Sequence, residues 1–170
     1  MVFDVGVVLD CDIVSALAKI DRIGLLAKIF KDQQLVIPNA VYVELLEAVK
    51  MGFTFPEKVF KSKIEVIAMN EKELKEFKNI AKNQKIHNGE AEGITIARNR
   101  NWVFLTNDGV AIKVCEQMDV SVLDLKDLLK IAARKNIIGE AEMLEIINDI
   151  ETKDNTVIVE KDEILQEYKI

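Results

Sequence analysis

The sequence predicts an α/β fold of three layers, α/β/α, in which helices cover both faces of a central, mostly parallel sheet. Three observations support this fold class. Short apolar segments alternate along the chain with longer segments of helical periodicity. The apolar segments lack the strict polar alternation of strands that face water on one side. The length of 170 residues suits a compact domain with a core of its own.

Four apolar runs are interpreted as strands, because each is short and bounded by polar or turn-forming residues. They cover residues 5–9, 35–37, 102–105 and 120–123. The first stops at Asp10, the second at Pro38 and the third at Thr106. The segment 64–68 either forms a further strand or ends a helix. Runs that are apolar throughout are typical of a parallel sheet that is buried on both faces.

Helical spacing of apolar residues predicts eight helices between and after these strands. The expected helices are 13–20, 23–30, 39–51, 70–83, one that begins at 88, and then 110–117, 125–134 and 139–150. Pro38 is placed to open the third of these, because a proline is tolerated where a helix begins. Asn70, with Glu73 three residues later, predicts a capping box at the start of the fourth.

Charge is distributed unevenly along the chain. The net charge is -6, but residues 138–170 hold ten acids and three lysines, whereas residues 1–137 hold 19 acids and 20 bases. The negative charge therefore belongs to the end of the chain. We divide the chain into a main domain, 1–137, and an acidic C-terminal helix and tail, 138–170, that packs on this domain or extends from it.

Several classes of protein are disfavoured by composition. No apolar run approaches the roughly 18–20 residues of a membrane span, and the first ten residues do not resemble a signal peptide. The two cysteines, Cys11 and Cys115, are too few for a disulfide framework and have no zinc-ligand spacing. We expect a cytoplasmic protein without a membrane partner.

Four acids are placed to meet at one edge of the sheet. Asp10 and Asp108 directly follow apolar strands, and the carboxyl ends of parallel strands form the ligand crevice of open α/β sheets. Glu44 lies about one and a half turns into the helix after the second strand, and Glu90 lies in the first turn of its helix. All four side chains can therefore reach the same edge.

Four neighbouring carboxylates require a compensating charge. Two unit charges about 4 Å apart repel by roughly 4 kcal/mol at an effective dielectric constant near 20. Hard oxygen ligands suit Mg²⁺ or Mn²⁺, and such ions can activate water for the hydrolysis of a phosphodiester. The absence of a Ser-His or Cys-His pair fits a reaction of this kind.

Three segments resemble the motifs of PIN domains. VVLDCDIVSALAKI resembles their opening strand with its aspartate, IPNAVYVELLEA is similar to their second motif, and GEAEGITIARNRNWVFLTND is similar to their third and fourth motifs. The resemblance runs from about 7 to 129 and places Asp10, Glu44, Glu90 and Asp108 in the acidic positions. It implies a ribonuclease that uses Mg²⁺ or Mn²⁺. It also suggests a VapC-like toxin with an antitoxin partner, and a homodimer.

Some positions leave alternatives open. Glu92 competes with Glu90 as the third acid, although Glu90 keeps the family's spacing to Ala97. Asp4 is an alternative first acid, and Glu47 is as available on its helix as Glu44. One metal ion or two would be consistent with this set.

Three further polar residues are candidates for support of the acids. Asp12 departs from the family pattern and either adds a fifth carboxylate or supports Asp10 by hydrogen bonding. Thr106 is placed to orient Asp108, and Asn107 lies between them in sequence.

Lysines follow one side of the predicted helix 70–83. They are Lys72, Lys75, Lys78, Lys82 and Lys85, mostly within an arc of roughly 140° at 100° per residue. They form either a solvated face or a track for RNA phosphates beside the crevice. His87, the only histidine, is either a surface loop residue or a substrate contact beside Glu90.

The sequence therefore predicts a Mg²⁺- or Mn²⁺-dependent endoribonuclease that hydrolyses RNA phosphodiester bonds by metal-activated water. Asp10, Glu44 and Asp108 would be metal ligands, and Glu90 a ligand or a water-orienting base. One alternative is a non-catalytic PIN-like module that binds protein or RNA through its acidic tail. Another is a phosphatase, or a nuclease that acts on DNA.

Overall fold

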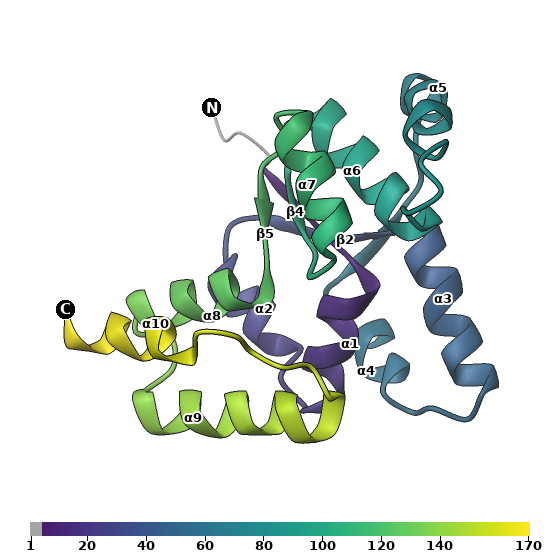
Figure 1. Ribbon diagram of the computed structural model, residues 1–170. Coiled ribbons are helices and arrows are strands. Elements are labelled where there is room, and N and C mark those ends of the chain that lie inside the picture. Colours follow the sequence, from purple (N-terminus) through teal and green to yellow (C-terminus); the bar gives the residue numbers. More distant parts are fainter. Residues whose placement is uncertain (1–4) are drawn as a thin grey trace.

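A computed structural model describes residues 5–170 and contains a five-stranded sheet in which all neighbouring strands are parallel (Figure 1). The strands are β1 (Gly6–Leu9), β2 (Gln34–Pro38), β3 (Glu65–Ile67), β4 (Val103–Leu105) and β5 (Val122–Leu123), in the spatial order β3-β2-β1-β4-β5. The predicted parallel sheet is confirmed, and the uncertain segment 64–68 contributes its third strand.

Helices follow every strand of this sheet. They are α1 (Cys11–Lys19), α2 (Gly24–Ile29), α3 (Asn39–Lys50), α4 (Pro56–Phe60), α5 (Glu71–Ile80), α6 (Asn88–Arg100), α7 (Gly109–Gln117), α8 (Leu125–Arg134), α9 (Glu140–Asp149) and α10 (Lys161–Gln166). A π-helical turn, η1 (Ile150–Asp154), continues α9, and a 3₁₀ turn, η2 (Glu167–Lys169), continues α10. None of the helices in residues 5–170 is long and apolar enough to cross a membrane.

The sheet separates two hydrophobic clusters, which makes the three layers. Val7 and Leu9 of β1 point into the larger cluster, shared with α1, α2, α8 and α9, whereas Val8 points into the smaller one, shared with α6 and α7. Successive strand side chains point to opposite faces, and all three are fully buried. The central strands are thus apolar throughout because both of their faces are covered.

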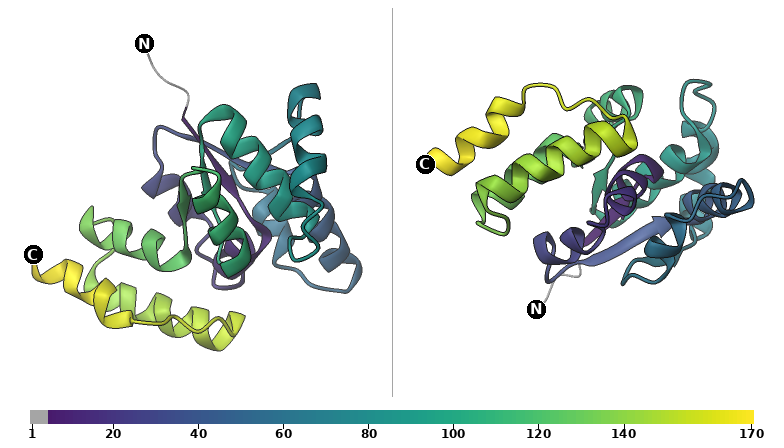
Figure 2. Two further views of the ribbon diagram at one scale, coloured as in Figure 1. Left: turned by 45° about the horizontal axis from the view of Figure 1, so that its top comes forward. Right: turned by 90° about the horizontal axis from the view of Figure 1, so that it is seen from below.

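The C-terminal residues pack onto the larger cluster. Ile146 of α9, Ile150 of η1 and Ile164 of α10 are buried in it. In Figure 2 the chain returns from η1 past α9, so that α10 lies along α8. Ion pairs join α8 to α10 and to the residues on either side of it: Lys126–Glu160 at 2.7 Å, Lys130–Glu163 at 3.4 Å and Arg134–Glu167 at 2.8 Å.

Helices α5 and α6 form a hairpin in which the start of α5 lies against the end of α6. Arg100 donates from Nε to the carboxylate of Glu73 at 2.7 Å, and Glu73 is fully buried. Glu76, one turn later, accepts hydrogen bonds from Arg98 and from Asn99. The predicted capping box of Asn70 and Glu73 is present, so Glu73 both caps α5 and ties it to α6.

Some element boundaries differ from the sequence-based expectation. Helix α5 ends at Ile80, not at 83. The short helices α4 and α10 were not predicted. Each has only five or six residues, too few to show a periodic pattern, and each is stabilised by packing rather than by its own propensity.

Candidate functional site

Asp10 and Asp108 lie at the point where the strand order of the sheet reverses. From β1 the chain proceeds to β2 and β3 on one side, and later to β4 and β5 on the other side. Such a switch point opens a crevice at the carboxyl ends of the strands. The Asp10 N–H donates to the Leu105 carbonyl at 2.9 Å, which holds the ends of β1 and β4 together. The crevice therefore begins between two acids.

All four predicted acids line one cavity of about 510 Å³ at this edge. Asp10 follows β1, Glu44 comes from α3, Glu90 from the start of α6 and Asp108 from the start of α7. Asp12, one of the supporting candidates, lines the same cavity. Asp10 and Glu90 are buried, whereas Glu44 is exposed and Asp108 is half-buried. The fold thus gathers side chains that are up to 98 residues apart, as residues 10 and 108 are.

Thr106 connects the two strand-end aspartates. Its buried hydroxyl donates to Asp10 Oδ2 at 2.7 Å and accepts a hydrogen bond from the Asp108 N–H at 3.2 Å. The other carboxylate oxygen of Asp10 accepts from the Cys11 N–H at 2.8 Å and caps α1. The expectation that Thr106 orients Asp108 needs one correction, because the side chain held directly by the hydroxyl is that of Asp10.

Asp108 and Glu90 also cap the N-termini of α7 and α6, respectively. Asp108 Oδ1 accepts from the N–H groups of Val110 and Ala111 at 2.9 and 2.8 Å. Glu90 Oε2 accepts from the His87 N–H at 2.9 Å. Both carboxylates sit where the positive end of a helix dipole favours a negative charge. Their second oxygens have no hydrogen bond within residues 5–170 and are available to the cavity.

Gly89 gives Glu44 access to the cavity. A Cβ atom at Gly89 would lie 2.7 Å from Glu44 Oε1 and 3.1 Å from Val41 Cγ2, so a side chain there would push the carboxylate aside. Glu92 of α6 contacts α3 instead of the cavity. Its Oε2 accepts a hydrogen bond from the Ala40 N–H, in the first turn of α3, at 3.0 Å. Helices α3 and α6 thus meet at Glu92, and Glu92 lies outside the cavity that Glu90 lines.

Asp12 and Asn107 form a second connection across the switch point. Asp12 Oδ2 accepts from the Asn107 N–H at 2.9 Å, and Asn107 Oδ1 accepts from the Leu125 N–H at 3.2 Å. Loss of hydration in the cavity, together with the charge of Asp10, raises the pKa of Asp12 to about 7. Asp12 thus contacts Asn107 directly, and its predicted support of Asp10 stays a prediction.

The cavity disfavours the charged forms of its acids. Burial raises the pKa of Asp10, and the charge of Asp108 adds to this, against the hydrogen bonds from Thr106 and Cys11. Loss of hydration and the charge of Asp10 likewise raise the pKa values of Glu44 and Glu90. Nearby like charges and desolvation act in the same direction for each group. A cation in the cavity would relieve both effects.

The donor chemistry of this cavity fits a hard divalent cation. Its acids supply only oxygen ligands, which Mg²⁺ and Mn²⁺ prefer. Within residues 5–170, however, no three His, Cys, Asp or Glu side chains stand close enough together to hold an ion as they are. One carboxylate oxygen each of Asp10, Glu90 and Asp108 accepts a hydrogen bond from a backbone N–H group instead. Side-chain rotations would have to close the set.

Besides the predicted acids and their supporting residues, four residues with polar or thiol side chains line the cavity. His87, whose side chain is 83% exposed, lies at the mouth with Nδ1 3.7 Å from Glu90 Oε1. Cys11 and Ser15 line the wall one helical turn apart on α1. Their spacing from Asp10 could have indicated from the sequence that they lie near the acids. Thr156 comes from the loop before α10, and no sequence pattern indicated it. Asp4, the alternative first acid, lies outside the described residues.

Comparisons with known proteins agree with this architecture. A family model described as PIN domain matches residues 6–167, almost the whole chain. The crystal structure of PAE2754 from Pyrobaculum aerophilum matches with a TM-score of 0.54 and 18% sequence identity, over 76% of this chain and 98% of that chain, which shows a common fold. No curated protein matches the chain. PIN domains are generally nucleases, so the match supports a hydrolase of nuclease type. The chain belongs to the PIN-domain family.

Proposed function

We propose that this protein is a Mg²⁺- or Mn²⁺-dependent endoribonuclease that hydrolyses RNA phosphodiester bonds. The observation that carries the proposal is the convergence of Asp10, Glu44, Glu90 and Asp108 on one cavity at the switch point of the sheet. Desolvation and mutual repulsion raise the pKa values of the first three acids. An arrangement that raises the free energy of its own charged groups is typical of functional sites.

In this proposal Asp10, Glu44 and Asp108 hold the cation, and Glu90 is a further ligand or orients the attacking water. A divalent cation bound there would activate water and neutralise charge that develops on the phosphate. Thr106 keeps the Asp10 carboxylate in place through its 2.7 Å hydrogen bond. The backbone N–H groups at the start of α7 fix one oxygen of Asp108, and its second oxygen has no hydrogen bond within residues 5–170 and would be the one to bind the cation.

The test is Mn²⁺-dependent cleavage of a labelled single-stranded RNA by purified variants. Asp10→Asn and Asp108→Asn each lose activity by at least 100-fold, while Glu47→Gln, a surface change one turn beyond Glu44 on α3, cleaves like the wild type. A parallel pair compares Glu90→Gln, which loses activity, with Glu92→Gln, which keeps the acceptor for the Ala40 N–H. Unchanged cleavage by Asp10→Asn and Asp108→Asn would show that the proposal is wrong. Single-stranded DNA of the same sequence tests the DNA alternative.

The alternative of a non-catalytic module that docks through its acidic tail has less support. Seven of the ten acids in residues 138–170 already form ion pairs within the described chain, three of them with α8. These charges are largely satisfied inside the molecule. We propose that residues 1–137 carry the catalytic function and that 138–170 form a packed C-terminal part.

Three finer expectations remain part of the proposal; the first two rest on the family resemblance and the third on the composition of the chain. They are an antitoxin partner, a homodimer and a location in the cytoplasm. Light scattering during gel filtration measures the mass in solution, and a mass near 19.2 kDa would exclude the dimer. Co-purification with a tagged product of the neighbouring gene tests the antitoxin.

A further inference from the structure

Five lysines lie on the outside of α5 and in the turn that follows it. They are Lys72, Lys75, Lys78, Lys82 and Lys85, which we name the α5 lysine track, and every one of them is exposed. The only ion pair of the track within residues 5–170 is a 3.7 Å contact between Lys75 and Glu71, and both of these side chains are at least 77% exposed. An exposed pair of this kind contributes little binding energy and is readily exchanged.

The remaining acids of α5 do not neutralise the track. Glu73 is fully buried in its ion pair with Arg100, and Glu76 is engaged by Arg98 on the same helix α6. Each of these acids therefore pairs directly with an arginine, and Lys72 acts on Glu73 only as a weaker, more distant charge. The outer side of α5 keeps an excess of positive charge, while its inner side is electrically balanced against α6.

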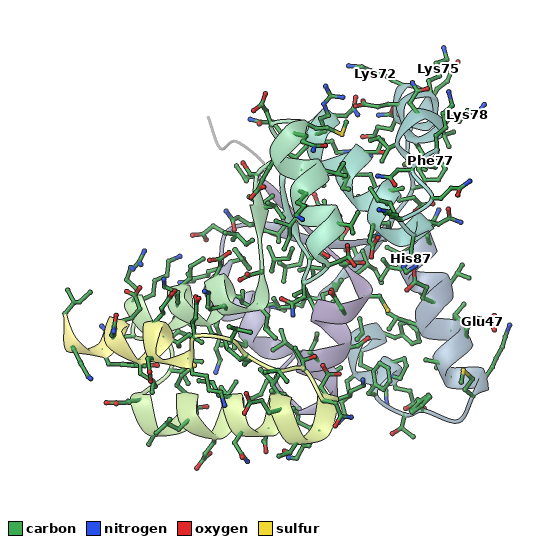
Figure 3. All side chains as sticks on the ribbon, in the orientation of Figure 1. Glu47, Lys72, Lys75, Phe77, Lys78 and His87 are labelled. Atoms are coloured by element: carbon green, nitrogen blue, oxygen red, sulfur yellow. The ribbon has the colours of Figure 1, made fainter. Side chains whose placement is uncertain are left out.

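The α5 lysine track leads toward the acidic cavity. Because α5 and α6 form a hairpin, the track passes from the end of α6 toward its beginning, where His87 and Glu90 stand. In Figure 3 Lys72, Lys75 and Lys78 project from α5 in different directions, with Lys72 extending to the left and Lys78 to the right, and His87 lies below them, between α5 and α3. His87 lines the mouth of the cavity, so the track ends at the proposed site.

A second group of basic residues near the cavity is not available in the same way. Leu125, which lines the cavity, begins α8, and the basic residues of that helix face the tail. Lys126 contacts both Glu160 and Glu163, and Arg134 contacts Glu167. The tail thus neutralises the α8 side of the cavity and leaves the α5 side open to an anion.

We propose that the α5 lysine track binds the phosphate backbone of single-stranded RNA and leads the strand past His87 into the acidic cavity. The inference rests on the proposed ribonuclease function and adds a route for the substrate to it. Lysines supply salt-sensitive contacts to phosphate without reading the base. The track therefore raises affinity for any RNA sequence and leaves the choice of cleavage position to the cavity.

The test compares two triple variants with the same loss of charge. Lys75→Gln/Lys78→Gln/Lys82→Gln removes the centre of the track. Lys28→Gln/Lys31→Gln/Lys63→Gln removes three exposed lysines that do not line the acidic cavity and form no ion pair within residues 5–170. The probe is a fluorescent 12-nucleotide RNA of mixed sequence, and anisotropy is measured in EDTA over a range of KCl so that binding is separated from cleavage.

The track variant is expected to bind RNA on the order of tenfold more weakly at low salt, while the control variant binds like the wild type. Each phosphate contact to a single strand contributes about 0.7 to the slope of log affinity against log salt, so the track variant loses roughly 2 from that slope. Equal slopes for both variants would overturn the inference. The α5 lysine track would then be a candidate binding surface for an acidic protein. If the wild type cleaves RNA but the two variants have equal slopes, only the inference is wrong. If the wild type binds RNA through the track but does not cleave it, only the proposed function is wrong.

Discussion

The hydroxyl of Thr106 donates a 2.7 Å hydrogen bond to the carboxylate of Asp10, a residue 96 positions earlier in the chain. The same hydroxyl oxygen accepts from the Asp108 N–H, so one buried side chain sets the relative position of two strand ends. The geometry of the first and last acids therefore depends on a residue that is not itself an acid.

Substitutions of Thr106 should separate the contribution of its hydroxyl group to activity from the contribution of its side-chain packing. Thr106→Val keeps the shape but leaves Asp10 Oδ2 and the Asp108 N–H without their partner, which costs about 1–3 kcal/mol of unfolding free energy. Thr106→Ser restores the hydroxyl. We expect RNA cleavage to fall at least tenfold in the valine variant and to recover in the serine variant, as measured by kcat alongside urea unfolding. Equal kcat in both variants would remove this role of the hydroxyl.

Gly89 offers a test of the placement of Glu44. Gly89→Ala brings a methyl group to 2.7 Å from Glu44 Oε1, and the flexible side chain must move away. Cleavage should drop by tenfold or more, with a loss of thermal stability of only a few degrees. Gly139→Ala is the matched control, since Gly139 precedes the same Glu-Ala-Glu sequence and has open space around it. Similar activities for the two variants would contradict this placement.

Glu73 predicts a pH dependence of stability. Burial alone would raise the pKa of Glu73, but hydrogen bonds from Arg100 and the Asn70 N–H lower it below the ordinary value of 4.5. An acid whose pKa is lowered in the folded state stabilises that state above its ordinary pKa, and this contribution is lost as the pH falls through the folded value. Urea unfolding of the wild type between pH 7 and pH 3 should show this loss as a decrease in the free energy of unfolding.

The Glu73→Gln variant provides the comparison for that measurement. At pH 7 it is destabilised by roughly 1–3 kcal/mol, because the partly exposed Arg100 loses its counter-charge but keeps access to water. The difference between wild type and variant should shrink below pH 4.5. A difference that stays constant down to pH 3 would exclude the ionised pair as its source.

Glu44 tests the electrostatic cost of the cavity. An acid with a raised folded pKa destabilises the folded state as the pH rises from the ordinary to the raised value, so removal of its charge is favourable at neutral pH. Glu44→Gln should melt at the same or a slightly higher temperature than the wild type in EDTA. Added Mn²⁺ should raise the melting temperature of the wild type more than that of the variant, because only binding to the folded state stabilises it. Glu47→Gln should respond to Mn²⁺ like the wild type.

The position of the strand-end acids at one edge of the sheet was predictable because its signal is local. Asp10 and Asp108 each end an apolar run, and the position of a residue after a parallel strand determines which edge it reaches. Glu44 was found through Pro38, which fixes where α3 begins. The choice between Glu90 and Glu92 needed the contact of Glu92 with α3, which no periodicity contains.

The C-terminal part shows why some contacts of the folded chain were not predictable from the sequence. Its acids suggested an external partner, but Glu160, Glu163 and Glu167 pair with α8, and a pairing partner is a property of the folded chain. Thr156 reaches the cavity wall through a loop that follows a π-helical turn, and neither feature has a sequence signature as strong as helical periodicity. The α5 lysines were visible in the sequence, whereas the arginines that free them from the neighbouring acids belong to another helix.

The hairpin of α5 and α6 fixes the distance between the start of the α5 lysine track and the cavity. Helix α6 has 13 residues and therefore a length of about 20 Å, with Glu90 near one end and the arginines that anchor α5 at the other. A strand held at the far end of α5 would reach the cavity only after crossing most of that length. Very short oligonucleotides could occupy one end but not both, so the hairpin would set a minimum substrate length.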